Sequence, residues 1–294
     1  MKRIGFIGVG IMGKSMVRNL MKAGYELNIF ARTKAKVEDV IAEGAVFHDT
    51  IGECVKDCDA VITIVGFPKD VEEVYFDGGN ILESAKEGAY LIDMTTTSPM
   101  IAEEIYQEGA KRGFHVLDAP VTGGDTGAKA GTLSILVGGD KADYEACVSL
   151  FEAMGTNINY QGKAGCGQHA KLANQIMIAG TLSGVCEALT YAKAKELDLD
   201  TVVKSVSTGA AGSRQLDLFA PKIMAEDYAP GFFMKHFIKD MTLALTEANR
   251  SGLCLEVLSQ VLANYEELQA AGYGELGTQA LIKYYEEGCA EDDE

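Results

Sequence analysis

The sequence predicts an α/β domain with a doubly wound, mainly parallel sheet, followed by an all-helical domain. Short apolar runs alternate with helical segments in the first part of the chain, a pattern typical of a sheet covered by helices on both faces. A glycine-rich turn directly follows the first apolar run. After Gly165 helical periodicity dominates and no alternating strand pattern remains. We therefore expect two domains, at residues 1–163 and 164–294.

The first domain is expected to begin with a strand at residues 3–9, whose continuous apolar run is typical of a buried parallel strand. A helix follows and ends at Gly24. Further strands are predicted from apolar runs at 27–31, 60–65, 89–94 and 115–119, with helices between them at 34–43, 69–75 and 99–112. Strands at 132–138 and 157–161, with a helix at 140–154 between them, complete the predicted sheet.

The second domain is expected to contain only helices. Their periodicity places them at 167–195, 199–206, 214–225, 234–251, 254–271 and 277–287. The most apolar stretch, 176–192, carries Glu187 and several small or hydroxyl residues. It therefore indicates a buried core helix rather than a membrane span.

The composition is that of a soluble globular protein, with 47% hydrophobic and 23% charged residues. A formal net charge of −17 opposes nucleic-acid binding, because that function relies on a basic surface. Part of this charge lies in an acidic C-terminal end that we expect to be solvated, Glu286–Glu287 and Glu291–Glu294.

The seven cysteines form no Cys-x-x-Cys pair and no cluster with histidine at zinc spacing. We therefore expect reduced thiols and no metal site. The sequence enters a strand at once and shows no secretory signal, so a cytoplasmic location is expected.

The glycine-rich turn is Gly8-x-Gly10-x-x-Gly13. It follows a buried strand and opens a helix, which is the context of a Rossmann dinucleotide site. The glycines permit the tight turn and let a pyrophosphate approach the helix N-terminus, where Ile11 and Met12 would also contact the cofactor. The alternative is a glycine turn without a ligand.

Cofactor choice is expected to depend on the end of the second strand. Arg32, Thr33 and Lys36 lie there, and no acidic residue occurs before Glu38. Cationic and hydroxyl donors suit a 2′-phosphate, so we favour NADP. The alternative is that Arg32 only stacks on adenine, which would leave NAD acceptable.

Three further segments follow predicted strands, at 65–68, 95–97 and 120–124. Ligands of open α/β sheets bind at the carboxyl ends of strands, so we expect these loops to meet in one crevice. In the third, a loop from Thr122 to Gly127 combines a hydroxyl with several glycines. Its backbone N–H groups would form an anion-binding nest suited to a carboxylate; the alternative is a flexible connection.

Lys171 and Asn174 lie three residues apart on the first long helix of the second domain and so share one helix face. A lone lysine on a helix is usually solvated, but this one has small or apolar neighbours and lies near a helix N-terminus. The helix N-terminus, together with partial burial, disfavours the ammonium form, so we expect the pKa of Lys171 to be lowered toward neutrality. Lys171 is thus a candidate proton shuttle for an alcohol–carbonyl interconversion, with Asn174 holding the same oxygen. Composition alone marks Lys239-Asp240 as a surface charge pair.

At these residues the chain resembles the β-hydroxyacid dehydrogenase family, which includes 3-hydroxyisobutyrate dehydrogenase, tartronate semialdehyde reductase and the glyoxylate/succinic semialdehyde reductases. The resemblance runs nearly end to end. The motifs that carry it are Ile4–Gly13, Asp93–Pro99, Asp118–Gly124, Gly165-Cys166-Gly167 through Lys171 and Asn174, and Lys239-Asp240.

The resemblance implies that Lys171 is the catalytic acid/base and that Asn174 contacts the substrate. It places the substrate carboxylate among Thr122, Gly123 and Gly124. The cofactor contacts that it implies are Val65, Gly66, Phe67 and Thr96. Lys239 becomes a ligand of cofactor or substrate, held by Asp240.

The segment around Arg32 is similar to the NADP-using branch of the family, and pairing through the helical domains implies a homodimer or homotetramer. Two residues depart from the family pattern, Thr122 in place of a frequent serine and Ala31 in place of a frequent asparagine. The first keeps the hydroxyl but narrows the pocket, and the second weakens the NADP inference.

The leading hypothesis is an NADP-preferring dehydrogenase or reductase acting on a short β-hydroxyacid and its semialdehyde, a small carboxylate-bearing substrate. An imine reductase is an alternative with the same architecture, but such enzymes commonly carry a different proton donor at the position of Lys171. A non-catalytic, dehydrogenase-like binding module is the other alternative, and such relatives lose this lysine.

Overall fold

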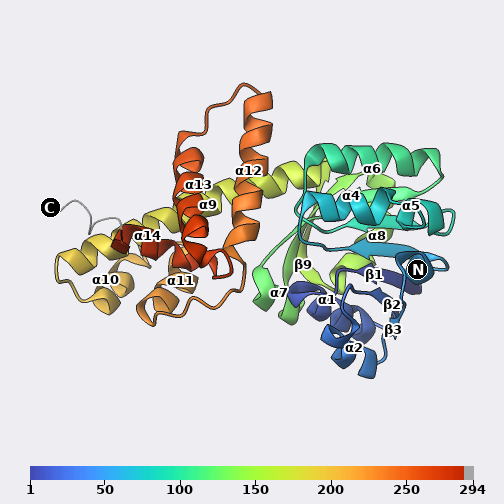
Figure 1. The fold of residues 1–294 in the computed structure, drawn as a ribbon, viewed down its shortest axis with the longest axis horizontal. Coiled ribbons are helices and arrows are strands. Elements are labelled where there is room, and N and C mark those ends of the chain that lie inside the picture. The colour runs from blue at the N-terminus through green and yellow to red at the C-terminus, as the bar shows by residue number, and fades with distance from the viewer. Residues whose placement is uncertain (288–294) are drawn as a thin grey trace. The chain divides into compact units, whose positions relative to one another are not determined.

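The structure is a computed structural model that describes residues 1–287. Cys289 and the acidic residues Glu291–Glu294 lie outside the described residues. The chain forms two compact units, Met1–Lys171 and the helices from Leu172 onward (Figure 1). Helix α9 (Cys166–Ala194) runs continuously through the boundary. The domain boundary expected after residue 163 stays a prediction.

The first unit contains one nine-stranded sheet in the order β3-β2-β1-β4-β5-β6-β8-β7, with β9 beside β8. The pairs from β3 to β6 are parallel, β8 is antiparallel to β6 and β7, and β9 is parallel to β8. The strands are β1 (Arg3–Ile7), β2 (Glu26–Phe30), β3 (Val46–Phe47), β4 (Ala60–Thr63), β5 (Tyr90–Asp93), β6 (His115–Asp118), β7 (Val121–Thr122), β8 (Leu133–Gly139) and β9 (Gly155–Gly162). This arrangement confirms the predicted doubly wound, mainly parallel sheet.

Helices pack on the sheet because successive residues of a strand point to opposite faces and so belong to two different hydrophobic cores. Phe6 of β1 belongs to one core with Met16 of α1, whereas its neighbour Ile7 belongs to a second core with Val71 of α4. The helical segments of this unit are α1 (Ile11–Lys22), the 3₁₀ turn η1 (Lys34–Lys36), α2 (Glu38–Ala42), α3 (Ile51–Val55), α4 (Pro68–Phe76), α5 (Ile81–Ser84), α6 (Pro99–Lys111), α7 (Gly124–Ala130) and α8 (Lys141–Glu152).

Several predicted boundaries differ from the structure. The strand expected at 3–9 ends at Ile7, because Gly8 adopts a positive φ of 97° and turns the chain. The helix expected at 34–43 is divided into η1 and α2 at Val37. The short elements β3, α3, α5, β7 and α7 were not predicted, because a few residues carry too little periodicity.

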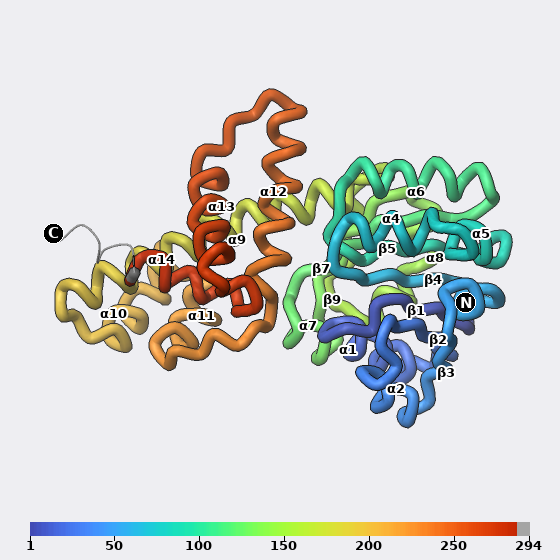
Figure 2. The backbone as a smooth tube through the Cα atoms, viewed as in Figure 1, coloured from blue at the N-terminus to red at the C-terminus, as the bar shows by residue number. Residues whose placement is uncertain are grey.

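The second unit is helical throughout its described part, with one isolated bridge between Phe233 and Gly277. After α9 come α10 (Leu199–Val206), α11 (Arg214–Met224), α12 (Met234–Arg250), α13 (Glu256–Leu268), the turns η2 (Gln269–Tyr273) and η3 (Thr278–Leu281), and α14 (Ile282–Glu287). Figure 2 shows α12 and α13 as neighbouring antiparallel helices. Their packing includes Phe237 and Tyr265, whose ring centres lie 5.4 Å apart with the rings edge to face. The predicted all-helical region is confirmed.

Helix α9 is long and apolar enough to cross a membrane by length and composition, a test that core helices of soluble proteins also pass. One face, with Leu182 and Cys186, is buried in the helical core. The other face is exposed and carries Met177 and Tyr191, so only 44% of its most apolar window is buried. The predicted core helix is thus buried along one side, and the cytoplasmic location stays a prediction.

Candidate active site

The glycine turn lies directly after β1. The surroundings of its three glycines differ, and so does the reason for a glycine at each position. Gly8 has a positive φ, and a Cβ there would overlap the carbonyl oxygen of Ile64. A Cβ on Gly13 would overlap the Gly8 carbonyl oxygen, so this glycine lets α1 approach the turn. A Cβ on Gly10 would meet no atom within 4 Å. Packing within the chain therefore does not require glycine at position 10, and the open space fits a ligand that approaches the backbone.

Helix α1 begins at this open space. Its first turn holds no acidic residue; Ile11 is exposed and Met12 packs against the core. The N–H groups of a first turn lack intrahelical partners and carry partial positive charge. The diphosphate of a dinucleotide fits here, since Gly10 leaves room and the helix supplies donors.

Arg32, Thr33 and Lys36 are all exposed just after β2. Arg32 Nη2 lies 3.1 Å from Asp70 Oδ1, and the other oxygen of Asp70 accepts the Phe67 N–H at 2.9 Å. The Arg32 side chain is 72% exposed, so this ion pair is weak. The guanidinium therefore keeps donors for a further anion. Asp70 was not predicted as a site residue.

A buried hydrogen-bond chain connects the ends of β4 and β5. Tyr75 and Thr63 share a hydrogen bond of 3.1 Å, and the Thr63 hydroxyl donates to Asp93 Oδ1 at 2.7 Å. The same carboxylate oxygen accepts the Thr95 N–H at 3.1 Å, and the Thr95 hydroxyl accepts the Val65 N–H at 3.0 Å. Burial raises the pKa of Tyr75, so its phenol stays protonated. The segment after β4 and the segment after β5 are thereby fixed to each other.

The remaining predicted cofactor contacts lie on this fixed frame. Val65 and Gly66 are partly exposed after β4, and Phe67 is exposed at the start of α4. Thr96 is partly exposed between Thr95 and Thr97, which are both buried. The predicted cofactor contacts are therefore accessible, whereas Thr95 and Thr97 beside them are buried and hydrogen-bonded.

The loop predicted from Thr122 to Gly127 is mostly not a loop. Thr122 ends β7 and pairs with Ser134 of β8, and α7 begins at Gly124. Gly123 and Gly124 have positive φ values of 131° and 66°, which make the turn between the two elements. The Gly127 N–H is already used, because it donates to the Gly123 carbonyl at 3.1 Å. The Gly127 N–H is therefore not available to an anion-binding nest, and the predicted carboxylate contact with Thr122, Gly123 and Gly124 stays a prediction.

The first turn of α9 is anchored on the sheet. Asp118, at the end of β6, accepts the N–H groups of Gly165 and Gln168, each at 2.8 Å. Burial raises the pKa of Asp118 to about 7, even though both N–H donors favour the carboxylate. Gly165 has a φ of 84°, and a Cβ on Gly167 would lie 2.6 Å from the Asp118 carbonyl oxygen. Both glycines of this motif are thus required by the backbone.

Lys171 lies one turn further along α9, three residues after Gln168 and so on the same helix face. Only 7% of Lys171 is exposed. Lys171 is therefore buried. Cys166, at the start of the helix, is partly exposed and has a free thiol.

The second unit holds the other polar cluster. Asn174 Nδ2 donates to Gln175 Oε1, and Gln175 Nε2 donates to Asp240 Oδ2, each at 2.7 Å. The second Asp240 oxygen lies 3.0 Å from Lys239 Nζ. Asn174 and Lys239 are thus joined through Gln175 and Asp240, which are both buried. Lys239 is not the exposed surface charge that composition indicated, because only 11% of its side chain is exposed.

Sequence reasoning assigned no role to Gln168, Gln175 or Asp70. A glutamine on a helix carries no local signal, because its partners come from distant segments. Asp118 and Asp93 did carry a signal, since each is the last residue of a strand in the sheet.

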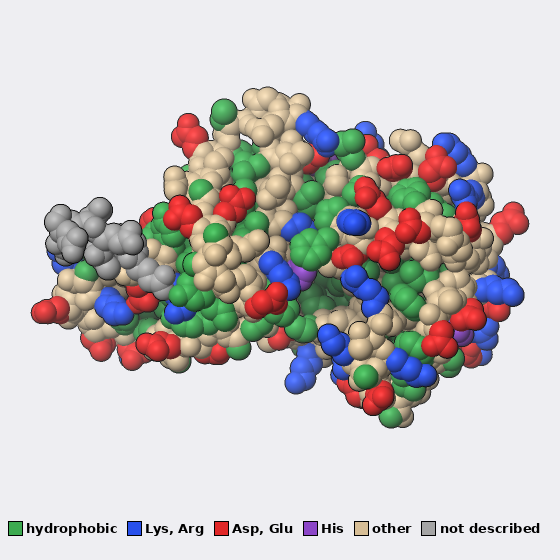
Figure 3. Space-filling model, viewed as in Figure 1, with side chains coloured by type: hydrophobic (Ala, Val, Ile, Leu, Met, Phe, Trp, Pro, Cys, Tyr) green, Lys and Arg blue, Asp and Glu red, His purple; other side chains and the backbone are tan. Residues whose placement is uncertain are grey.

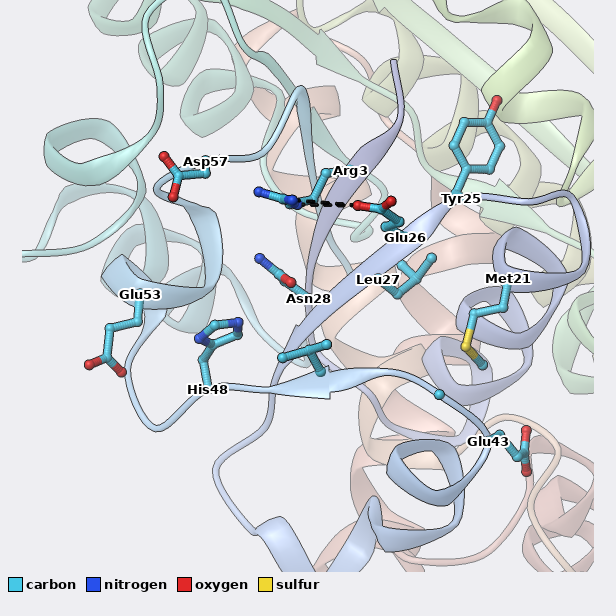
Figure 4. A pocket seen from close by; sticks show the side chains of 12 residues that line it. Arg3, Met21, Tyr25, Glu26, Leu27, Asn28, Glu43, His48, Glu53 and Asp57 are labelled. Atoms are coloured by element: carbon cyan, nitrogen blue, oxygen red, sulfur yellow. Dashed lines mark hydrogen bonds and ion pairs between the residues drawn. The ribbon is translucent and has the colours of Figure 1, made fainter.

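Residues 1–287 contain no group of three or more His, Cys, Asp or Glu side chains that could hold a metal ion. One cavity of about 560 Å³ lies around the amino-terminal ends of β1 to β3, lined by Arg3, Glu26 and His48 among others (Figure 4). The glycine turn lies at the opposite, carboxyl ends of the strands, where Rossmann sheets bind nucleotides. This cavity is therefore not the cofactor site. On the face shown in Figure 3, acidic and basic side chains are interspersed over the first unit.

Comparison with known proteins agrees with this geometry. Residues 3–162 match the family model of the NAD binding domain of 6-phosphogluconate dehydrogenase. Residues 165–285 match that of the NAD-binding region of NADP-dependent 3-hydroxyisobutyrate dehydrogenase. The chain is 48% identical to the uncharacterized oxidoreductase YkwC of Bacillus subtilis, over 97% of this chain and 99% of that protein.

It is also 44% identical to the probable 3-hydroxyisobutyrate dehydrogenase-like 1, mitochondrial, of Arabidopsis thaliana, over 95% of this chain and 84% of that protein. Among solved structures, the Mycobacterium tuberculosis 3-hydroxyisobutyrate dehydrogenase with L-serine superposes with a TM-score of 0.87. That match has 28% identity and covers 96% of this chain and 98% of the other. Because both parts of the chain match and the glycine turn leaves room for a diphosphate, the protein belongs to the β-hydroxyacid dehydrogenase family of NAD(P)-dependent oxidoreductases.

Proposed function

We propose that this protein transfers hydride between NADP(H) and a short β-hydroxyacid or its semialdehyde, with Lys171 as general acid and base. The observation that supports this most directly is the setting of Lys171. The lysine is buried, and the preceding turn of its helix is hydrogen-bonded to the end of β6 and to the segment that follows β5. The carboxyl ends of such strands are where Rossmann sheets bind ligands.

The nicotinamide, when bound, supplies or accepts the hydride at the substrate carbon. In the oxidative direction neutral Lys171 takes the hydroxyl proton on Nζ, and in the reverse direction its ammonium protonates the forming alkoxide. Asn174 would hold the same oxygen. The hydrogen bond from its Nδ2 to Gln175 supports this role, because it fixes the plane of the amide.

The substrate carboxylate would lie at the turn formed by Thr122, Gly123 and Gly124. Thr122 offers a hydroxyl, and the two glycines leave the backbone uncovered. Lys239, held by Asp240, would add a positive charge toward substrate or cofactor. L-serine, the compound solved with the related dehydrogenase, is itself a short β-hydroxyacid with a carboxylate.

NADP is the proposed preferred cofactor. Three exposed donors follow β2, and the Arg32 guanidinium lies 3.1 Å from Asp70 in the first turn of α4. A 2′-phosphate would add charge-assisted hydrogen bonds to Arg32, whereas NAD would not.

The proposed assembly is a homodimer or homotetramer that forms through the helical unit. Its support is the exposed face of α9, where small or apolar residues recur at helical spacing at Ala173, Met177, Gly184 and Tyr191. Met177 is 66% exposed. A second copy of the same face would cover this apolar strip.

Replacing Lys171 with Met tests the central claim. Turnover should fall by about 10²- to 10⁴-fold while cofactor affinity changes little, because the lysine is needed for proton transfer and not for nucleotide binding. Lys204→Met, at an exposed lysine of α10, is the matched control. Normal turnover of the Lys171 variant would remove this residue from the mechanism.

The substrate class is tested with a panel of small aldehydes, run with both nicotinamide cofactors. A semialdehyde that carries a carboxylate should react far better than its uncharged analogue. Equal rates would refute the carboxylate role of the Thr122–Gly124 turn. Faster reduction of a cyclic imine than of any semialdehyde would favour an imine reductase instead.

A further inference from the structure

A second buried side chain, that of Gln168, binds the first turn of α9 to the segment that follows β5. Its Oε1 accepts the Thr97 N–H at 3.0 Å, and its Nε2 donates to the Thr95 carbonyl oxygen at 2.7 Å. Gln168 is fully buried, and its own N–H donates to Asp118. Three hydrogen bonds of a single residue therefore tie α9 to the segment that follows β5 and to the last residue of β6.

The surrounding backbone is shaped to allow this contact. A Cβ on Gly138 of β8 would lie 2.5 Å from Asp118 Oδ1 and 2.7 Å from the Gly167 nitrogen. A Cβ on Gly167 would overlap the Leu136 carbonyl oxygen. Side chains at these two positions would push α9 away from the sheet, so the glycines and the hydrogen bonds serve the same close approach.

Gln168 also reaches both residues that flank Thr96, a predicted cofactor contact. Lys171 projects from the same face of α9 as Gln168. We propose that Gln168, together with Asp118, is a positioning residue that sets where Lys171 stands relative to the Thr95–Thr97 loop. The inference rests on the proposed acid/base role of Lys171. Misplacement of a reacting group by about 1 Å can cost roughly 10²-fold in rate.

Two substitutions separate the hydrogen bonds of the Gln168 side chain. Gln168→Glu keeps an acceptor for the Thr97 N–H but presents an oxygen to the Thr95 carbonyl. Gln168→Met removes both side-chain bonds and keeps a similar volume. Gln107→Glu, at an exposed position of α6, is the charge-matched control.

We expect kcat to fall by about 10-fold in Gln168→Glu and about 100-fold in Gln168→Met. The KM for the hydroxyacid should change less than threefold, and the primary deuterium isotope effect on kcat should rise because the chemical step becomes slower. Wild-type kcat in whichever of the two variants is folded would overturn the proposal.

Hydrogen exchange of the cofactor-free protein gives a readout that does not depend on activity. Amides in the segment 163–171 should exchange at least tenfold faster in Gln168→Met, while those of α12 stay unchanged. Wild-type exchange in this segment would refute the anchoring. If Lys171→Met retains turnover while the exchange result holds, the proposed chemistry fails but the anchoring stands.

Discussion

Asp118 should make the stability of this protein depend on pH, and Asp118→Asn should remove that dependence. The pKa of this carboxyl is raised from 3.8 to about 7 in the folded chain, because burial penalises its charged form. Between these two values the folded state holds a proton that the unfolded state has lost. The free energy of unfolding therefore falls as the pH rises through this window.

The size of the effect follows from the shift. Each pH unit inside the window changes the free energy of unfolding by about 1.4 kcal/mol. From pH 5.5 to 8.5 only the part below about pH 7 contributes, which gives a loss of about 2 kcal/mol. Starting at pH 5.5 also avoids precipitation near the isoelectric point of about 4.7.

Urea unfolding followed by circular dichroism measures this, since the chain has no Trp to report by fluorescence. The quantity of interest is the difference between wild type and Asp118→Asn at each pH. Asp57→Asn, at an exposed aspartate before β4, serves as the control and should give a flat difference. A flat difference for Asp118→Asn as well would show that the buried carboxyl is ionised throughout the range.

Three shorter predictions concern the cofactor site and the assembly. Arg32→Asp should lower the kcat/KM ratio of NADPH to NADH by at least about tenfold, because a carboxylate repels the 2′-phosphate; an unchanged ratio would mean that the phosphate is bound elsewhere. Gly10→Ala should weaken NADPH binding in a fluorescence titration, because its Cβ would occupy the space for the diphosphate. The thermal midpoint should not fall, since this Cβ meets no atom of the chain within 4 Å; unchanged affinity would show that the diphosphate does not bind at Gly10. If the protein assembles as proposed, Met177→Asp should shift it toward monomer in analytical ultracentrifugation, and an unchanged assembly would show that this face of α9 is not the interface.

The parts of the fold that could be predicted are those whose cause is local. Apolar runs mark buried strands, and Gly13 is specified by a local backbone contact, because a Cβ there would overlap the Gly8 carbonyl oxygen. The short β7 and α7 could not be predicted. The strand partner of Thr122 is Ser134, which is not a local neighbour, and the helix begins at two glycines, which give no helical signal. A glycine-rich stretch is compatible with either a loop or a turn between two elements.

The same distinction applies to the site. Lys171 could be singled out from its helix and its neighbours alone. Gln168 could not, because its partners Thr95 and Asp118 lie 73 and 50 residues away in sequence. Gln175 could not be predicted either, since its partner Asp240 is 65 residues away in sequence.

These two glutamines have a common consequence for the lysine between them. Gln168, Lys171 and Gln175 are spaced at three and four residues, so they lie along one face of α9. Gln168 is fixed to the Rossmann unit and Gln175 to Asp240 of the helical unit, each through buried hydrogen bonds. The backbone that carries Lys171 is therefore restrained one turn before and one turn after it. Such restraint is consistent with the proposed role of Lys171, because the rate of a proton transfer depends on a geometry that the helix must hold before the substrate arrives.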